Sequence, residues 1–100
     1  MANLESKFQG KLIKEIKTRL PGCIVTKLDP NHIQGMPDLL VLYESRYALL
    51  ENKRTKDAPH RPNQKYYVEL INEWSYAAFI YPENKEEILD ELQSALQSPR

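Results

Sequence analysis

Cysteine, glycine and long apolar runs are all scarce in this chain of 100 residues. The single cysteine, Cys23, forms no disulfide within the chain, and one cysteine with two histidines gives no zinc-ligand spacing. No apolar stretch approaches the roughly 18 residues that cross a membrane, and the polar, helix-like start is unlike a signal peptide. We therefore expect one cytoplasmic domain, residues 1–100, with no membrane partner.

An excess of positive charge is also missing, because 14 Lys and Arg residues balance 14 Asp and Glu residues. DNA-binding domains are usually basic, so this balance argues against a protein that simply coats DNA by charge. The charges are unevenly placed, however. Residues 53–65 hold five basic residues and one acid, a net of +4, and residues 83–91 hold five acids and one lysine, a net of −4. The basic segment favours a phosphate ligand, and we interpret the acidic one as a solvated helix face.

Hydrophobic periodicity predicts three helices and four strands. Helical spacing predicts helices over about 3–20, from Pro62 to about 74, and over 88–96. Short β-branched or apolar runs predict strands over 23–28, 39–43, 47–53 and 77–81. The first three strands are joined by short turns, which predicts antiparallel pairing, and a helix joins the last two, which predicts a parallel pair. The fold class is therefore α/β, a four-stranded mixed sheet flanked by helices in the order α-β-β-β-α-β-α.

Three finer expectations follow from the same patterns. The nearly continuous apolar strand at 39–43 should be covered on both faces. Asn84, with Glu87 three residues later, resembles a capping box. Three aromatic residues at helical spacing, namely Tyr66, Tyr67 and Trp74, are interpreted as core, with base stacking as the alternative.

Acidic and basic side chains interrupt two of the apolar strands. Asp38 follows Pro37 at the start of one, and Glu51 and Lys53 lie two apart in the next. Positions i and i+2 of a strand face the same way, so Glu51 and Lys53 should point to one side. Two acids and an ammonium at strand ends can hold a divalent cation beside a phosphodiester. The structural alternatives are a cross-strand ion pair or a strand that has emerged into solvent.

The pattern Pro37-Asp38 followed by Glu51-Asn52-Lys53 resembles the PD-(D/E)xK nuclease signature, and the order of elements resembles that superfamily's restriction-endonuclease-like core. Further features are similar to one branch, the VRR-NUC (virus-type replication-repair nuclease) domain. These are Gly35-Met36 before the Pro-Asp pair, Gln64 just inside the next helix, and Glu5 in the first helix. The resemblance covers roughly residues 4–96.

The resemblance implies a Mg²⁺ or Mn²⁺ site. Asp38 and Glu51 would be carboxylate ligands, the backbone carbonyl of Asn52 a third, and Glu5 a further one, directly or through water. Lys53 would position or deprotonate the attacking water and stabilise charge on phosphorus. Gln64 would project toward the metal waters or the phosphate. Glu5 could instead be an acid favoured at a helix start, and Gln64 an ordinary surface amide.

Basic side chains around the motif are candidates for contact with DNA phosphates. The candidates are Lys27, Arg54, Lys56, His60, Arg61 and Lys65. The loop residues His32 and Gln34 could also approach DNA, although a loop histidine is more often a bystander.

The function predicted from the sequence is metal-dependent endonucleolytic cleavage of DNA. The resemblance implies branched substrates, such as four-way (Holliday) junctions or flaps, and symmetric incision of a junction would favour a homodimer. Family habit and size suggest a stand-alone domain of a phage, acting in the bacterial host cytoplasm. The alternatives are a sequence-specific or non-specific DNA endonuclease, or a non-catalytic nucleic-acid binding module on the same fold.

Overall fold

A computed structural model describes the backbone of residues 4–98 and the side chains of residues 6–98. Its helices are α1 (Leu4–Arg19), α2 (Gln64–Trp74) and α3 (Lys85–Gln97). Its strands are β1 (Ile24–Lys27), β2 (Leu39–Tyr43), β3 (Arg46–Asn52) and β4 (Tyr76–Ile80). The order α-β-β-β-α-β-α is therefore confirmed, with element ends within a few residues of the prediction.

The strands form one sheet in the order β1-β2-β3-β4. β1 pairs with β2, and β2 with β3, in antiparallel register, whereas β3 and β4 are parallel. This is the predicted mixed sheet. Only two residues separate β2 from β3, and Glu44 takes the left-handed conformation (φ 56°) that so tight a turn needs. A parallel pair cannot be closed by so short a turn, and α2 supplies the crossover from β3 to β4.

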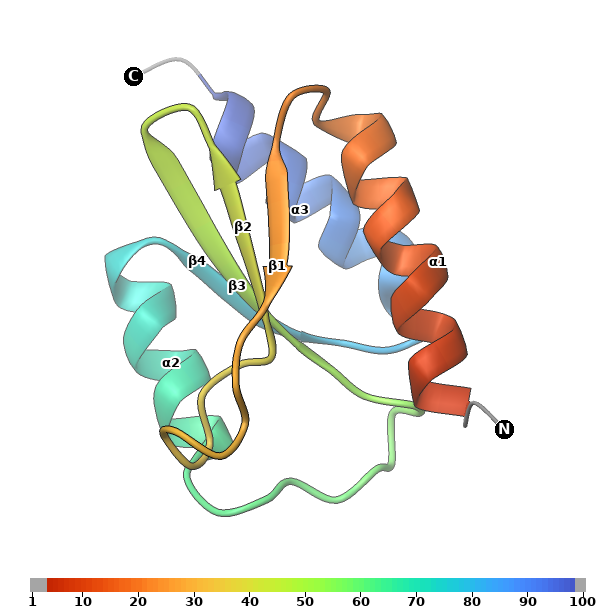
Figure 1. Ribbon diagram of the computed structural model, residues 1–100, viewed down its shortest axis with the longest axis vertical. Coiled ribbons are helices and arrows are strands. Elements are labelled where there is room, and N and C mark those ends of the chain that lie inside the picture. The colour runs from red at the N-terminus through yellow and green to blue at the C-terminus, as the bar shows by residue number, and fades with distance from the viewer. Residues whose placement is uncertain (1–3, 99–100) are drawn as a thin grey trace.

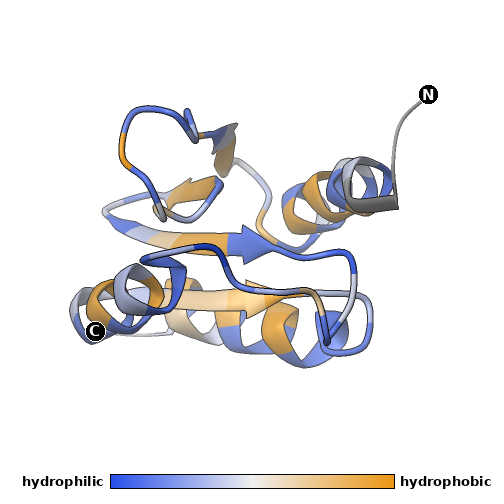
Figure 2. Ribbon diagram, turned by 90° about the horizontal axis from the view of Figure 1, so that it is seen from below, coloured by the Kyte–Doolittle hydropathy of each residue, from blue (hydrophilic) through white to orange (hydrophobic). Residues whose placement is uncertain are grey.

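Helices cover both faces of the sheet (Figure 1). α1 and α3 pack on one face, where Leu12, Ile16 and Leu92 meet Val41 and Leu50 in the larger core cluster. α2 packs on the other face, in a smaller cluster made by Leu49, Val68, Ile71 and Ala77. Figure 2 shows hydrophobic residues concentrated in the strands and helices, and hydrophilic residues in the connecting loops. Alternate residues of β3 thus serve two separate clusters, as the period of two requires.

The predicted burial of the aromatic side chains and of β2 was partly wrong. Tyr66 and Trp74 are 59% and 64% exposed, and Leu42 of β2 and Ile24 of β1 are 37% and 60% exposed. The reason is geometric. α2 is the crossover between β3 and β4 and packs over those two strands. On the same face of the sheet no helix among residues 4–98 covers β1 and the neighbouring part of β2, so Ile24 and Leu42 stay exposed there.

Two predicted helix starts also differ from the structure. Pro62 was expected in the first turn of a helix, but α2 begins at Gln64, after Asn63 in the left-handed conformation (φ 69°). Asn84 does not cap α3 with its side chain. Its Oδ1 accepts from Tyr81 N (2.9 Å) and its Nδ2 donates to Phe79 O (3.1 Å), so it ties β4 to α3 instead.

Over the part of the chain that the structure describes, no helix combines the length and the apolar character that crossing a membrane requires. Cys23 is half-buried against the larger cluster, and no other cysteine exists for it to pair with. Burial raises the pKa of its thiol, so Cys23 is a poorer nucleophile than an exposed cysteine.

Candidate active site

The turn from β2 to β3 places Asp38 and Glu51 at the same end of the sheet. Leu39 pairs with Leu50 at the end of the antiparallel ladder, and one further step in the same register sets Asp38 opposite Glu51. Directly opposite residues of an antiparallel pair point to the same face, with Cβ atoms about 4.5–5.5 Å apart. The two acids, 13 residues apart in the sequence, are therefore neighbours in the structure.

Hydrogen bonds fix the Asp38 carboxylate in place. Asn52 N donates to Oδ1 (2.9 Å), and Gln9 Nε2 of α1 donates to Oδ2 (2.9 Å). The main chain of Asp38 is also held, because Leu28 N donates to its carbonyl (2.8 Å). Gln9 is a site residue that the sequence reasoning missed, and no motif marked it.

Glu51 and Lys53 are buried although both are ionisable, with exposures of 5% and 6%. Charged residues are almost never fully buried unless they are paired or serve a function. Burial at these positions excludes one structural alternative, a strand that has emerged into solvent by residue 51. β3 in fact extends through Asn52, and Lys53 N still donates to Ile80 O of β4 (2.8 Å).

Lys53 and Gln64 form a buried network between β3 and α2. Lys53 Nζ donates to Gln64 Oε1 (2.6 Å) and to the carbonyl of Pro59 (3.1 Å). The same Gln64 oxygen accepts from Arg61 N (2.8 Å), and the side chain is only 6% exposed. Gln64 is therefore not an ordinary surface amide. Its carboxamide oxygen holds both the lysine ammonium and the loop that precedes α2.

These side chains line an open cavity of about 790 Å³. Most of its lining residues come from the loops before β2 and before α2, and these two loops lie at the bottom of Figure 1. Asp38, Glu51, Lys53 and Gln64, predicted from separate parts of the sequence, all belong to its wall. The other lining residues are Pro30, Asn31, Gln34, Gly35, Met36, Arg54, Ala58, Pro59, His60 and Arg61.

The available donors suit a hard divalent cation. In a strand the N–H and C=O of one residue point to the same side, so the Asn52 carbonyl faces the side on which Asn52 N reaches Asp38. Two carboxylates and this carbonyl form an oxygen-only donor set of the kind that Mg²⁺ and Mn²⁺ prefer. Among residues 6–98 no group of three or more His, Cys, Asp or Glu side chains is placed so that it could hold a metal ion. The side chain of Glu5, the predicted further ligand, lies outside the described residues.

The predicted DNA-contact residues divide into two groups. Arg54, His60 and Arg61 line the cavity and are exposed. The three lysines are exposed but are not part of the cavity wall, namely Lys27, Lys56 and Lys65. Lys65 instead lies 3.9 Å from Glu69 on the surface of α2. Gln34 also joins the wall, whereas His32 does not.

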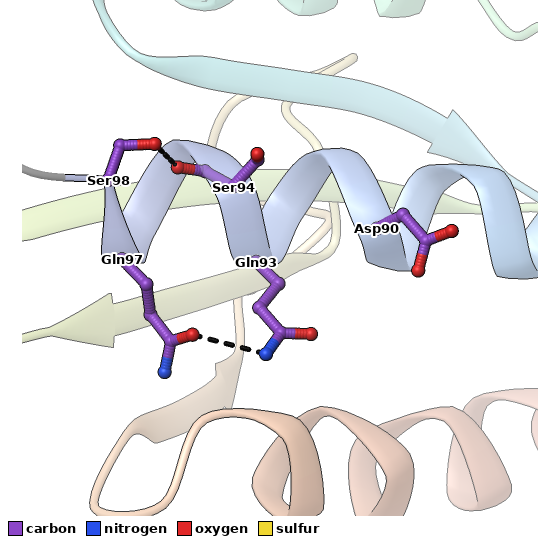
Figure 3. A pocket seen from close by; sticks show the side chains of 5 residues that line it. All are labelled: Asp90, Gln93, Ser94, Gln97 and Ser98. Carbon is purple, nitrogen blue, oxygen red and sulfur yellow. Dashed lines mark hydrogen bonds between the residues drawn. The ribbon is translucent and has the colours of Figure 1, made fainter.

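A second hollow, of about 360 Å³, runs along the surface of α3 (Figure 3). Its side chains bond to one another or to α1. Gln93 Nε2 donates to Gln97 Oε1 (3.1 Å), Ser98 Oγ donates to Ser94 O, and Arg19 Nη1 donates to Asp90 Oδ1 (2.6 Å). These bonds hold the surface of α3 together. Among its described lining residues, the hollow therefore has no group of side chains comparable to Asp38, Glu51 and Lys53 in the larger cavity.

Gly35 holds the loop before β2 against the start of α2. Its φ is +93°, and a Cβ atom built on it would lie 2.6 Å from Asn63 Cβ, 2.7 Å from Asn63 C and 2.8 Å from Pro62 O. Two of these three atoms belong to the backbone and cannot move aside cheaply. The glycine noted in the motif thus permits the close approach of two loops that form the cavity wall.

We expect Gly35→Ala to lower the free energy of unfolding by about 3 kcal/mol, through left-handed strain plus the backbone overlap. Gly22→Ala is the matched control, because Gly22 has a similar φ of +89° but no atom within 4 Å of the added Cβ. It should cost only about 1–2 kcal/mol. Urea unfolding of both variants measures the difference, and equal losses would show that the close approach at Gly35 contributes nothing.

Neither a protein-family model nor a curated protein matches this chain. What the chain does is therefore inferred from the motif, from the geometry of the cavity and from general chemistry.

Proposed function

We propose that this chain is a metal-dependent DNA endonuclease, a VRR-NUC-like member of the PD-(D/E)xK superfamily. One observation carries the proposal. Asp38, directly before β2, and Glu51 of β3 line the wall of one open cavity together with the buried Lys53. A binding-only protein has no use for two carboxylates next to a phosphate, since without a cation they would repel it.

The residues present fit a Mg²⁺ or Mn²⁺ ion, which Asp38, Glu51 and the Asn52 carbonyl would hold, with Glu5 as a further candidate. Bound there, the cation would neutralise phosphate charge and acidify a water molecule. Asn52 N and Gln9 Nε2 fix the Asp38 carboxylate before any ligand arrives. Such preorganisation of a ligand by its neighbours supports affinity and geometry.

Lys53 is the chain's own electrophilic group. Its ammonium is held by two neutral oxygens, Gln64 Oε1 and Pro59 O, which orient the charge without cancelling it. In a buried setting such a charge acts strongly on nearby anions. We assign Lys53 the stabilisation of negative charge that builds up on the phosphate, and the orientation of the attacking water. Gln64 acts through Lys53 and is a positioning residue.

Arg54 and Arg61 would contact DNA phosphates, because both are exposed at the rim of the cavity. We expect Arg61→Ala to weaken DNA binding and to reduce the slope of log affinity against log salt by about one unit. Lys65→Ala is the matched control, since Lys65 lies outside the cavity wall and near Glu69. Fluorescence anisotropy at several salt concentrations measures both. A larger effect of Lys65→Ala would move the DNA path away from the cavity.

The proposed substrate is branched DNA, either a four-way junction or a flap. A domain of this size has little surface for long sequence readout, so recognition of shape through phosphates is favoured. The test compares a labelled junction with its linear duplex in Mg²⁺, in Mn²⁺ and with a chelator. Metal-dependent incision near the branch supports the proposal. Equal cutting of both DNAs leaves a non-specific or sequence-specific nuclease, and binding without cutting leaves a binding module.

We also propose that the working form is a homodimer in the cytoplasm of a phage-infected or bacterial cell. Two copies related by a two-fold axis could cut both strands of a symmetric junction. The support for a second copy is the exposed apolar row where Ile24 pairs with Leu42 on the open face of the sheet. Light scattering of the purified protein measures the mass, and Leu42→Asp should give a monomer if this row is the interface.

A further inference from the structure

We propose that His60 is a stacking platform for one unpaired base next to the phosphate that is cut, which favours substrates with a single-stranded flap. This inference rests on the proposed nuclease function, because it assigns a substrate feature to the same cavity. The sequence predicted His60 as a contact for DNA phosphates, whereas stacking uses its flat ring.

The His60 ring is already held in a stacking geometry. It lies parallel to the ring of Phe79, with centroids 4.2 Å apart and an angle of 9° between the planes. His60 lines the cavity and is exposed, whereas the half-buried Phe79 is not among the lining residues. Phe79 therefore backs the imidazole, and the histidine is the ring that meets the cavity. A ring fixed in this way loses little entropy when a second flat group stacks on it.

The register of the sheet places this platform beside the proposed metal site. Phe79 of β4 pairs with Glu51 of β3, and partners in register project on the same face of a sheet. The neighbouring strand is about 4.8 Å away. His60, stacked on Phe79, lines the same cavity as Glu51, so we place the base that stacks on His60 next to the phosphate held near Glu51. Arg61 follows His60 directly and also lines the cavity, so it could hold the adjacent phosphate.

Stacking on His60 requires a base with a free face. Inside a duplex both faces of a base are covered by its neighbours, and exposing one costs a few kcal/mol. At the foot of a flap the first unpaired base has a face free without that cost. Base–aromatic stacking in single-strand binding proteins contributes about 1–3 kcal/mol per base, so the platform should discriminate strongly between a flap and paired DNA.

The test compares a flap, the same flap with an abasic residue at its first unpaired position, and a closed four-way junction. Binding is measured with proteins that also carry Glu51→Gln, so that no DNA is cut. Cleavage rates are measured with proteins that keep Glu51. His60→Ala removes the ring, His60→Phe keeps a ring without a charge, and His60→Lys keeps a charge without a ring. Thermal unfolding of each variant establishes that it is folded.

For the intact flap we expect His60→Ala and His60→Lys to bind about 5- to 150-fold more weakly, the range of one lost stacking contact. His60→Phe should remain within about threefold of the parent, as retention of the ring predicts. The parent protein, which carries Glu51→Gln alone, should bind the abasic flap more weakly than the intact flap by the same factor. The His60→Ala variant should bind the two flaps equally. On the closed junction, where every base is paired, His60→Ala should have little effect.

Other results would overturn the platform. Rescue by His60→Lys but not by His60→Phe would make the residue a phosphate contact. Equal loss on the flap and on the closed junction would remove the link to an unpaired base. In both cases the wild-type protein would still cut DNA. If the wild-type protein neither binds nor cuts DNA under any condition, the proposed nuclease function fails together with the platform.

Discussion

Glu51→Gln should abolish DNA cleavage while leaving the fold intact. The substitution keeps the shape of the side chain but removes one of the two carboxylates at the cavity. Loss of metal-assisted charge stabilisation of about 4 kcal/mol corresponds to a rate reduction on the order of 10³-fold. The free energy of unfolding should not fall by more than about 1 kcal/mol, because burying a neutral amide costs less than burying a carboxylate. Single-turnover cleavage of a labelled flap or junction measures the rate.

Glu73→Gln is the matched control, since it makes the same chemical change at an exposed position of α2. It should cleave DNA at the wild-type rate. Binding of DNA by Glu51→Gln should persist, which separates loss of chemistry from loss of affinity. Cleavage by Glu51→Gln within a few-fold of wild type would contradict the assignment of Glu51 as a metal ligand, and with it the proposed mechanism.

Lys53→Met should also abolish cleavage, with an unusual accompanying result, namely little or no loss of stability. Methionine keeps most of the volume and apolar length of lysine and removes a buried ammonium. Replacing buried charges by apolar residues of similar volume is often neutral or stabilising. We expect a rate reduction of about 10²–10³-fold, as for loss of one preorganised donor to a developing anion. The free energy of unfolding should stay within about 1 kcal/mol of the wild-type value.

Gln64→Leu gives the opposite stability result and so tests the network. It leaves the buried Lys53 ammonium and Arg61 N without the oxygen that accepts from both. Loss of a buried partner of a charged group costs about 2–3 kcal/mol. The double variant Lys53→Met with Gln64→Leu should lose less free energy of unfolding than the sum of the losses in the two single variants, as expected for residues in contact. Denaturant unfolding of all four proteins measures this coupling, and strict additivity would contradict it.

Hydrophobic periodicity was enough to predict the elements of the fold. The helical and alternating patterns gave three helices and four strands in the observed order, because both periods are consequences of backbone geometry. Turn length then gave the pairing, since a two-residue connection can join only antiparallel strands and a helix can join parallel ones. The proximity of Asp38 and Glu51 followed from the hairpin, one step beyond the ladder pair of Leu39 with Leu50.

Burial of the helix surface could not be predicted in the same way. The stripe containing Tyr66 and Trp74 has the spacing of a core face, yet both side chains are exposed. The sequence pattern shows which residues share a helix face, but it does not show how much of that face the strands of the sheet will cover. α2 packs on β3 and β4, and only the arrangement of the sheet decides which flank of the helix is left in solvent.

The sequence alone determined the order of the elements and the identity of the acids and the lysine that define the candidate site. The tertiary structure decided what surrounds them. Gln9 of α1 binds Asp38, Gln64 of α2 holds Lys53, and Phe79 of β4 supports His60. The first pair is 29 residues apart in the sequence and the second 11. Local periodicity carries no information on such contacts, because they arise only when separate elements pack on one sheet.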